Sequence, residues 1–220
     1  MEKTSVSKAA LGRFPEYLKV LRELPPETVP HISATAIAQK LSLGEVQVRK
    51  DLAAVSGAGK PKLGYVTAEL IERLEEILGC NHRTKAVLVG AGKLGRALLQ
   101  YNEFQKYGIE IVTAFDSNEQ VLSLNGKTQI LPMNRFEAFC KAQNIRLGII
   151  TVGEGSAQTV CDQMVQSGIS AIWNFAPCKL NVPAGILLQN ENLALSLAHL
   201  NLLLCNQNQE DTTWTPKTIS

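Results

Sequence analysis

The feature that most constrains the fold is a glycine motif between an apolar run and a helical pattern. Gly90-Ala91-Gly92-Lys93-Leu94-Gly95 follows the apolar run 85–89 and opens a helix predicted over 93–104, with Arg96 in its first turn. In such a motif the first glycine permits a tight turn and the second lets the backbone approach a pyrophosphate. The third lets the helix pack close to the sheet, and the helix N-terminus offers free N–H groups to phosphates. We therefore predict a dinucleotide site at Gly90 to Arg96.

The chain after this motif alternates between strand and helix patterns. Predicted strands follow at 109–115, 147–152, 171–175 and 186–189, and predicted helices at 134–143 and 157–167. Asn134 and Glu137 have capping-box spacing at the first of these helices. This alternation predicts βαβ units and a Rossmann-type parallel sheet over 84–190. Asp116 ends the second strand, 24 residues after Gly92, where an acid bonds the adenosine ribose and favours NAD over NADP.

The polar segment 151–156 ends a strand and is expected to line the cofactor crevice, with Thr151, Val152 and Gly153 nearest the strand. Glu154 is a candidate base, although a solvated loop carboxylate is the preferred interpretation. His31, His82 and His199 form no metal-ligand pattern, so we assign no catalytic or metal residue. A small NAD-dependent oxidoreductase with an N-terminal helical domain remains an alternative, as does a CoA- or nucleotide-binding subunit.

The N-terminal third, residues 1–80, predicts a different architecture. Residues 5–24 indicate one helix or two, with Pro15 suited to the first turn of a second piece. Ser33 can cap a helix over 34–41, a turn follows at 42–44, and a second helix covers 45–55. This spacing is typical of a helix-turn-helix, and the Gly- and Lys-rich stretch after it predicts a wing. Thr67 can cap a last helix over 68–78, before a polar boundary at 79–84.

This N-terminal part carries the residue types that bind DNA. Residues 1–65 contain ten Lys and Arg against six Asp and Glu, whereas the remainder is mildly acidic. Arg49 and Lys50, with Gln47 beside them, lie in the second helix of the motif and can bond base edges. Lys60 and Lys62 in the wing can meet phosphates or enter a minor groove. A merely solvated charged face is the competing interpretation.

The C-terminal helix, predicted over 191–206, is apolar nearly all round. Leu193, Leu197, Leu200 and Leu204 form one stripe, and further leucines lie outside it. Such a helix needs burial, which indicates packing against a second subunit. The remaining residues, 207–220, are expected to fray. The apolar stretch is too short to span a membrane, no signal segment opens the chain, and five scattered cysteines indicate a reducing cytoplasm.

The sequence resembles the bacterial Rex-type redox-sensing transcriptional repressors over about residues 7–205. The segments that carry the resemblance are FPEYLKVLREL, ISATAIAQKL, VQVRKDLAAV, VLVGAGKLGRALLQY, IVTAFD, LGIITV and SGISAIWNFAPCKLNVP. The resemblance implies a winged-helix DNA-binding domain, an NAD(H)-binding Rossmann domain and a homodimer that exchanges C-terminal helices. It also implies that reduced cofactor releases double-stranded operator DNA.

The resemblance also implies roles for individual residues, and it shows positions at which this sequence differs from the usual family pattern. Tyr101 matches the sensing tyrosine of the family, and Asn174, Phe175, Ala176 and Pro177 match its cofactor-binding loop. Lys19 and Asn192 stand where relatives usually have Arg and Asp, a pair thought to form across the dimer in one state. Pro61 and Lys62 replace a wing Arg and Gly, and Gly153 replaces a Pro. We therefore expect a weaker switch contact and altered wing and nicotinamide contacts.

Overall fold

The computed structural model describes residues 6–24, 27–122 and 128–210. The chain divides into two compact units. The first comprises Met1–Arg83 with Asn102–Ile109, and the second comprises Thr84–Tyr101 with Glu110–Ser220. The division lies near the boundary expected at 79–84. The segment Asn102–Ile109 follows the helix that the glycine motif opens, yet it belongs to the first unit. The sequence did not indicate this.

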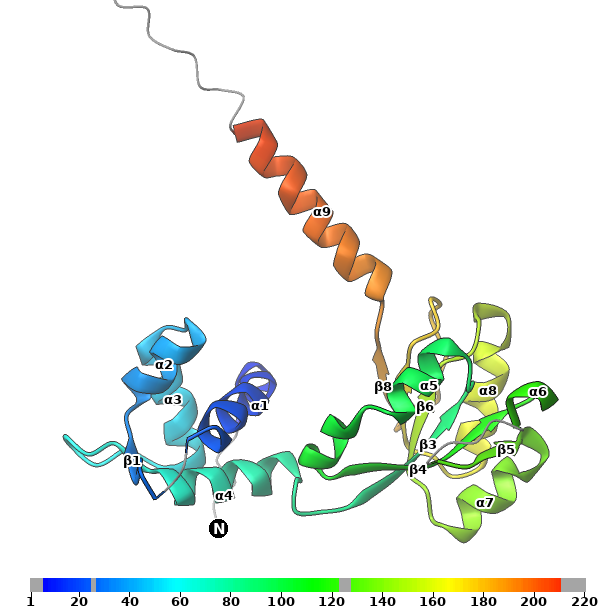
Figure 1. Cartoon of the computed structure of the whole chain (residues 1–220), viewed down its shortest axis with the longest axis horizontal. Coiled ribbons are helices and arrows are strands. Elements are labelled where there is room, and N and C mark those ends of the chain that lie inside the picture. Colours follow the sequence, from blue (N-terminus) through cyan, green and yellow to red (C-terminus); the bar gives the residue numbers. More distant parts are fainter. Residues whose placement is uncertain (1–5, 25–26, 123–127, 211–220) are drawn as a thin grey trace, which may run out of the picture. The chain divides into compact units, whose positions relative to one another are not determined.

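The first unit contains the expected helix-turn-helix and wing (Figure 1). Its elements are α1 (Lys8–Arg22), β1 (His31–Ile32), α2 (Ala34–Leu41), α3 (Glu45–Ser56), β2 (Tyr65–Val66) and α4 (Thr67–Leu78). The Ser33 hydroxyl caps α2 by accepting from the Ala36 N–H at 3.0 Å. Strands β1 and β2 pair antiparallel, and the chain between α3 and β2 forms the wing. The winged-helix fold class is therefore confirmed.

Helices α1, α3 and α4 pack around one apolar core. The side chains of Phe14, Leu18 and Leu52 are fully buried there, together with Leu70 and Leu74 of α4. These positions recur at helical spacing, so each helix contributes one apolar stripe to the centre. The polar faces of α3 and of the wing are thereby left on the outside.

Of the two alternatives for residues 5–24, the single helix is confirmed and the break at Pro15 is wrong. Helix α1 continues through Pro15, although a proline removes one backbone hydrogen bond from a helix interior. Its neighbours Phe14 and Tyr17 are fully buried, and this burial outweighs the lost bond. Thr67 does not cap α4. It is the first helical residue, and its hydroxyl donates instead to the Val29 carbonyl at 2.6 Å.

The second unit is a six-stranded sheet in the order β5-β4-β3-β6-β7-β8. Its strands are β3 (Thr84–Val89), β4 (Ile109–Asp116), β5 (Ile130–Pro132), β6 (Leu147–Ile150), β7 (Ala171–Asn174) and β8 (Leu187–Asn190). Strand β6 runs parallel to both β3 and β7, as does β5 to β4 and β8 to β7. This is the Rossmann order, with its switch point between β3 and β6. Ligands bind at the carboxyl ends of such strands.

The helices of this unit correct several predicted bounds. They are α5 (Lys93–Leu99), α6 (Glu119–Leu122), η2 (Met133–Arg135), α7 (Phe136–Ala142) and α8 (Glu154–Gln166). The short helix η1 (Asn102–Tyr107), which follows α5 in sequence, belongs to the first unit. The helix predicted over 93–104 ends at Leu99. Asn134 does not cap a helix, because it lies inside the 3-10 turn η2. Helix α8 begins directly after Gly153, so Glu154 is helical rather than in a loop. Strand β5 and helix α6 were not predicted.

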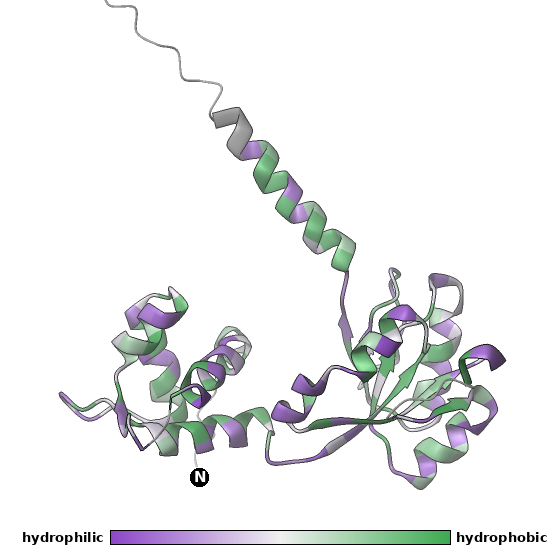
Figure 2. Cartoon of the chain, viewed as in Figure 1, coloured by the Kyte–Doolittle hydropathy of each residue, from purple (hydrophilic) through white to green (hydrophobic). Residues whose placement is uncertain are grey.

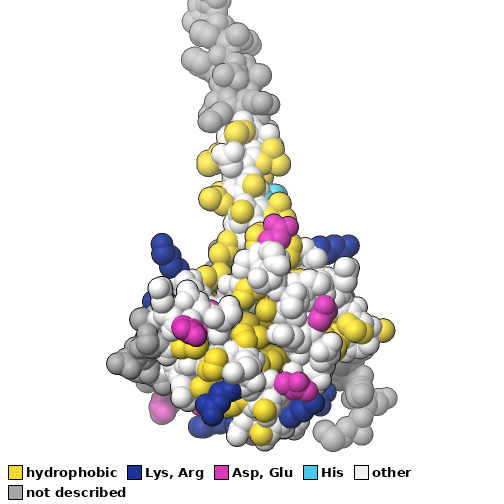
Figure 3. All heavy atoms as spheres, turned by 90° about the vertical axis from the view of Figure 1, so that its right-hand side faces the viewer, with side chains coloured by type: hydrophobic (Ala, Val, Ile, Leu, Met, Phe, Trp, Pro, Cys, Tyr) yellow, Lys and Arg dark blue, Asp and Glu magenta, His cyan; other side chains and the backbone are white. Residues whose placement is uncertain are grey.

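Helix α9 (Leu193–Glu210) closes the described chain. It extends beyond the predicted end at 206, so residues 207–210 are helical rather than frayed, and residues 211–220 lie outside the described part. Its leucines remain 46–68% exposed within one chain. Figure 2 shows that apolar residues make up most of this helix, and Figure 3 shows apolar side chains along its visible face. A helix of this kind is stable only when a further surface covers it.

Candidate cofactor and DNA-binding sites

The glycine loop after β3 has the geometry that the sequence predicted. Gly90 has a φ of 102°, and a Cβ there would lie 2.8 Å from the Thr151 carbonyl carbon. A Cβ at Gly95 would lie 2.0 Å from the Gly90 carbonyl oxygen. At Gly92, by contrast, no heavy atom lies within 4 Å of the Cβ position, and the residue is exposed. Two glycines are therefore required by packing, whereas Gly92 leaves an open surface for a ligand.

The carboxylate of Asp116 lies against this loop. Its Oδ2 accepts a 2.7 Å hydrogen bond from the Ala91 N–H, and its Oδ1 accepts from the Asn118 N–H at 2.8 Å. Neighbouring strands β3 and β4 bring the two segments together, although 25 residues separate them in sequence. Each carboxylate oxygen retains a second lone pair that can accept from a ribose hydroxyl. The acid thus lies where an adenosine ribose would be expected.

Thr151 joins the two sides of the switch point. Its hydroxyl donates to the Gly90 carbonyl at 2.7 Å, and its backbone N–H donates to the Val89 carbonyl at 2.9 Å. Val152 packs directly against the position that a Gly90 side chain would occupy. Exposed Gly153 then caps α8 in an extended conformation. The structure therefore brings the predicted residues 151–153 to the edge of the glycine loop.

The first turn of α5 presents exposed side chains beside Gly92. Lys93 and Leu94 are exposed, as is Arg96, whose Nε lies 3.4 Å from the Gly92 carbonyl oxygen. Tyr101 follows the end of α5 and is 54% exposed. The cationic side chain of Arg96 thus lies beside the glycine loop at Gly92, where it could meet an anionic group.

The residues 174–177, expected from the family resemblance to form a cofactor-binding loop, are not all accessible to a ligand. The Asn174 side chain is fully buried, and its Nδ2 lies within hydrogen-bond distance of the Ala176 and Cys178 carbonyls and of Asn190 Oδ1. Its Oδ1 accepts from the Ala176 N–H at 2.9 Å. Asn174 therefore shapes the turn from inside. Phe175 is half-buried and Pro177 exposed, so these two can face a ligand.

The predicted DNA-contacting residues lie on the surface of α3 and the wing. Gln47, Arg49 and Lys50 are exposed on α3, and Lys60 and Lys62 are exposed on the wing. The groups do not all face the same way. Arg49 pairs with Glu45 along one flank of the helix. Gln47 donates its amide to Asp51 at 3.2 Å along the other flank, which leaves Lys50 between them.

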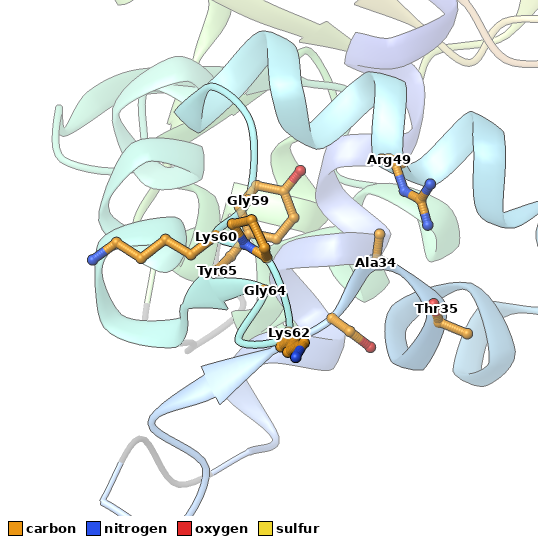
Figure 4. Close-up of a pocket in the computed structure, with 10 residues that line it drawn as sticks. Ala34, Thr35, Arg49, Gly59, Lys60, Lys62, Gly64 and Tyr65 are labelled. Carbon is orange, nitrogen blue, oxygen red and sulfur yellow. The ribbon is translucent and has the colours of Figure 1, made fainter.

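A hollow of about 390 Å³ separates Arg49 from the wing (Figure 4). It is lined by Ser33, Ala34, Thr35, Arg49, Gly59, Lys60, Pro61, Lys62, Gly64 and Tyr65. Lys60 and Gly64 form an isolated antiparallel bridge that closes the wing turn, and Lys62 has a φ of 66° at its tip. A Cβ at Gly64 would lie 2.3 Å from the Ile32 carbonyl oxygen. The wing is thus fixed at its base and carries two cationic side chains, Lys60 and Lys62, while Arg49 of α3 lies on the opposite side of the hollow, near the N-terminus of α2. Figure 4 shows the Lys60 side chain pointing away from that N-terminus.

A buried ion pair, which sequence reasoning missed, anchors α3 to α1. Asp51 is 4% exposed and accepts two bonds from Arg13, Nε to Oδ2 at 2.7 Å and Nη2 to Oδ1 at 2.9 Å. The Tyr17 hydroxyl donates to Oδ2 at 2.7 Å. Burial alone would raise the pKa of Asp51, but the hydrogen bonds from Arg13, Tyr17 and Gln47 lower it overall. Arg13 and Tyr17 are spaced i, i+4 on α1, and that spacing was the available signal.

The two proposed switch residues belong to different units. Lys19 is exposed on α1 of the first unit. Asn192 precedes α9, and its Oδ1 accepts from the Leu195 N–H at 2.9 Å, so it caps that helix. This capping role was not predicted from the sequence, although asparagine is a preferred N-cap residue. Among the described residues, no helix is long and apolar enough to cross a membrane, and no His, Cys, Asp and Glu side chains cluster as a metal site.

Two family models match the chain. One, described as a putative DNA-binding protein N-terminus, matches residues 5–53, and the other, described as a CoA binding domain, matches residues 81–178. A redox-sensing transcriptional repressor Rex of Treponema denticola is 36% identical over 206 residues, which is 93% of this chain and 98% of the relative. The corresponding repressor of Porphyromonas gingivalis is 35% identical, over 89% of this chain and 90% of its own length.

Solved structures of a repressor of the same kind are also similar to this chain. A crystal structure of RSP with β-NAD+ and operator DNA matches with a TM-score of 0.87 at 32% identity, covering 94% of this chain and 96% of that one. A structure of RSP with β-NADH matches with a TM-score of 0.82 at 31% identity, covering 95% and 99%. RSP is described as a Rex-family repressor.

Proposed function

The chain belongs to the Rex family of redox-sensing transcriptional repressors, and from this membership we propose how its two units act together. The winged-helix unit binds double-stranded operator DNA, the Rossmann unit binds NADH or NAD, and NADH releases the operator. One observation carries the proposal: a single chain joins a helix-turn-helix with an exposed basic helix to a glycine loop that lies against Asp116. Such a protein senses the NADH/NAD ratio and represses transcription in the cytoplasm.

We assign the cofactor contacts to residues around the switch point. The backbone at Gly92 receives the pyrophosphate, Asp116 bonds the ribose hydroxyls, and Arg96 meets a phosphate oxygen. A carboxylate in this position would repel a 2′-phosphate, which favours NAD over NADP. The remaining residues of the proposed site are Gly90, Ala91, Lys93, Leu94, Gly95, Tyr101, Thr151, Val152, Gly153, Asn174, Phe175, Ala176 and Pro177. Of these, Asn174 and Ala176 are buried and shape the loop from inside.

We propose a regulator and not an enzyme. Within the Rossmann unit the only histidine of the sequence is His199 on α9, and Glu154 is an exposed residue of a helix first turn. Neither is suited to proton transfer at a nicotinamide. An oxidoreductase would change the nicotinamide absorbance when a substrate is added. A CoA-binding subunit, the third class, would instead show CoA competing with NADH.

Separate titrations of NADH and NAD+ into a complex of the protein with a labelled operator duplex test the proposal. We expect fluorescence anisotropy to fall at far lower concentrations of NADH than of NAD+. A Gly92→Val variant serves as the control, because its side chain has room in the fold yet blocks the approach of a pyrophosphate. It should bind the duplex and not respond to NADH. A complex that resists both nucleotides would refute redox sensing, and displacement by CoA alone would favour the third class.

The proposed assembly is a homodimer formed through α9. The exposed leucines of α9, with Leu187 on the edge strand β8 at 72% exposure, supply the apolar surface that a second copy would cover. A twofold dimer presents two recognition helices and therefore reads two half-sites of an operator. In this arrangement Gln47, Arg49 and Lys50 contact the major groove, while Lys60 and Lys62 track the backbone.

The coupling between cofactor and DNA is expected to be smaller in this protein than in relatives that carry an ion pair at the switch contact. Relatives usually carry an Arg–Asp pair where Lys19 and Asn192 stand here, and the amide of Asn192 cannot form an ion pair. A charge-assisted contact contributes about 1–2 kcal/mol more than a neutral one, so the factor by which NADH weakens DNA binding should be reduced. Tyr101 and the cofactor contacts then supply the remainder. By linkage, DNA must weaken NADH binding by the same factor.

Restoring the pair with Lys19→Arg and Asn192→Asp tests this contact. Aspartate caps a helix as well as asparagine does, so the bond to Leu195 can be retained. We expect the coupling factor, measured from NADH affinity with and without operator, to rise about ten-fold. An unchanged factor would show that these two residues do not carry the switch.

A further inference from the structure

We propose that Val46 reads a thymine, by placing its side chain against the C5-methyl group of one operator thymine in the major groove. The inference rests on the proposed function to the extent that α3 must be the helix that enters the groove. It adds a base-reading residue to a face that otherwise offers only polar and charged groups.

The position of Val46 on α3 is the first step. The buried residues of this helix are Val48, Asp51 and Leu52, and they define the face packed on the core. With 100° between successive helical residues, Val46 projects roughly opposite to that face. Lys50, one turn later, projects in nearly the same direction. Val46 therefore lies at the centre of the surface that α3 offers to DNA.

The exposure of Val46 is the second step. Its side chain is 80% exposed, more than any other exposed large apolar side chain of the described residues. The leucines of α9, which await a partner, reach at most 68%. A β-branched residue also has a lower helix propensity than alanine. Val46 thus contributes nothing to the core and little to α3 itself, and its side chain is free to meet an apolar group outside the chain.

The groups around Val46 are the third step. Arg49 is held by Glu45 on one flank, and the amide of Gln47 is held by Asp51 on the other. Because a carboxylate only accepts hydrogen bonds, the Gln47 amide nitrogen must face Asp51. Both flanking polar groups are thereby drawn sideways, which leaves an apolar centre beside Lys50. The thymine methyl is the apolar group that base edges display in the major groove.

The test removes the C5-methyl group from single thymines of the duplex and both γ-methyl groups from Val46 of the protein. A duplex selected by the protein from a randomised pool is prepared with each thymine of one half-site replaced singly by deoxyuridine. Affinities are measured by fluorescence anisotropy for the parent protein and for Val46→Ala. We expect one position at which loss of the methyl weakens the parent about four-fold, the effect of one buried methyl group. In Val46→Ala the same change should matter less than about two-fold.

Leu63→Ala is the matched control, because Leu63 is an apolar wing residue with 54% exposure. Whatever its own affinity, it should retain the full thymine effect. Because Val46 is exposed and alanine has the higher helix propensity, Val46→Ala should not lower the unfolding transition. If no thymine shows a penalty in the parent, or if the penalty persists in Val46→Ala, the inference is wrong while DNA binding stands. If the parent selects no duplex from the pool, the proposed function fails and the inference falls with it.

Discussion

The ion pair that fixes the recognition helix offers the sharpest test of the structure. Replacing Asp51 with asparagine keeps the size of the side chain and removes its charge. Arg13 then loses a bidentate acceptor, and one of its N–H groups faces an amide NH2 in place of a carboxylate oxygen. The buried Tyr17 hydroxyl keeps at most one acceptor. The change should loosen α3 from α1; of the residues proposed to touch DNA it directly affects only Gln47, whose amide donates to Asp51.

The size of this effect follows from burial. Removing one partner of a buried pair costs about 3–5 kcal/mol. The Asp51 side chain is 4% exposed, but that of Arg13 is 25% exposed and can recover some hydration. We therefore expect about 2–3 kcal/mol, which corresponds to opening of α3 made about 30- to 150-fold more frequent.

The effect should depend on pH in a defined direction. Burial would raise the pKa of Asp51, but the bonds from Arg13, Tyr17 and Gln47 hold it below its unfolded value. A carboxyl whose pKa is lowered by folding stabilises the fold above its unfolded pKa, about 3.9, and this contribution is lost as the pH falls through the folded pKa. Burial raises the pKa of Tyr17 to about 12, so the hydroxyl stays a neutral donor throughout. Parent and variant should therefore differ fully at neutral pH and converge only below about pH 4.

Amide hydrogen exchange read by mass spectrometry measures this effect directly in peptides of α3. Tryptophan fluorescence would not report it, because both tryptophans of the chain lie outside the first unit. Peptides from α3 should exchange faster in Asp51→Asn by the factor given above. Glu75→Gln is the matched control, since the Arg22–Glu75 pair also joins α1 to another helix but is 30% and 25% exposed. It should change protection by less than about 1 kcal/mol. Equal protection of α3 in parent and Asp51→Asn at neutral pH would refute the anchoring role.

Three further predictions concern the cofactor, the wing and the assembly. Asp116→Ala should weaken NADH binding measured by calorimetry by about 1–3 kcal/mol, since a charge-assisted bond to ribose is lost, and an unchanged affinity would remove this residue from the site. Lys60→Ala and Lys62→Ala should each weaken binding to all DNA sequences alike and lower the salt slope by about one unit, and a parent-like slope would exclude phosphate contact. Truncation after Asn190 should remove α9 and give monomer or aggregate in sedimentation, whereas a well-behaved dimer would contradict the proposed interface.

Local patterns in the sequence were sufficient for the elements that carry both sites. Gly95 packs against the Gly90 carbonyl only five residues away, and Gly90 forms the turn between them, so both roles could be inferred from spacing alone, whereas the approach of Gly90 to Thr151 could not. The same holds for Ser33, whose hydroxyl caps the helix that directly follows it. Helix bounds were less well determined, because the packed surroundings decide where a helix ends: α5 stops at Leu99, and α8 begins at Glu154.

Contacts between distant segments were decided only by the tertiary structure. Asp51 pairs with Arg13 across 38 residues, and Asp116 bonds the Ala91 N–H across 25. The segment Asn102–Ile109 belongs to the first unit, and its Gly108, with a φ of 72°, packs against the backbone of residues 79–82. A Cβ there would lie 2.4 Å from the His82 carbonyl oxygen. The sequence determines which residues favour a helix, a turn or a phosphate. Which of them meet depends on packing that no local pattern encodes, because a close-packed interior admits only particular pairs of surfaces.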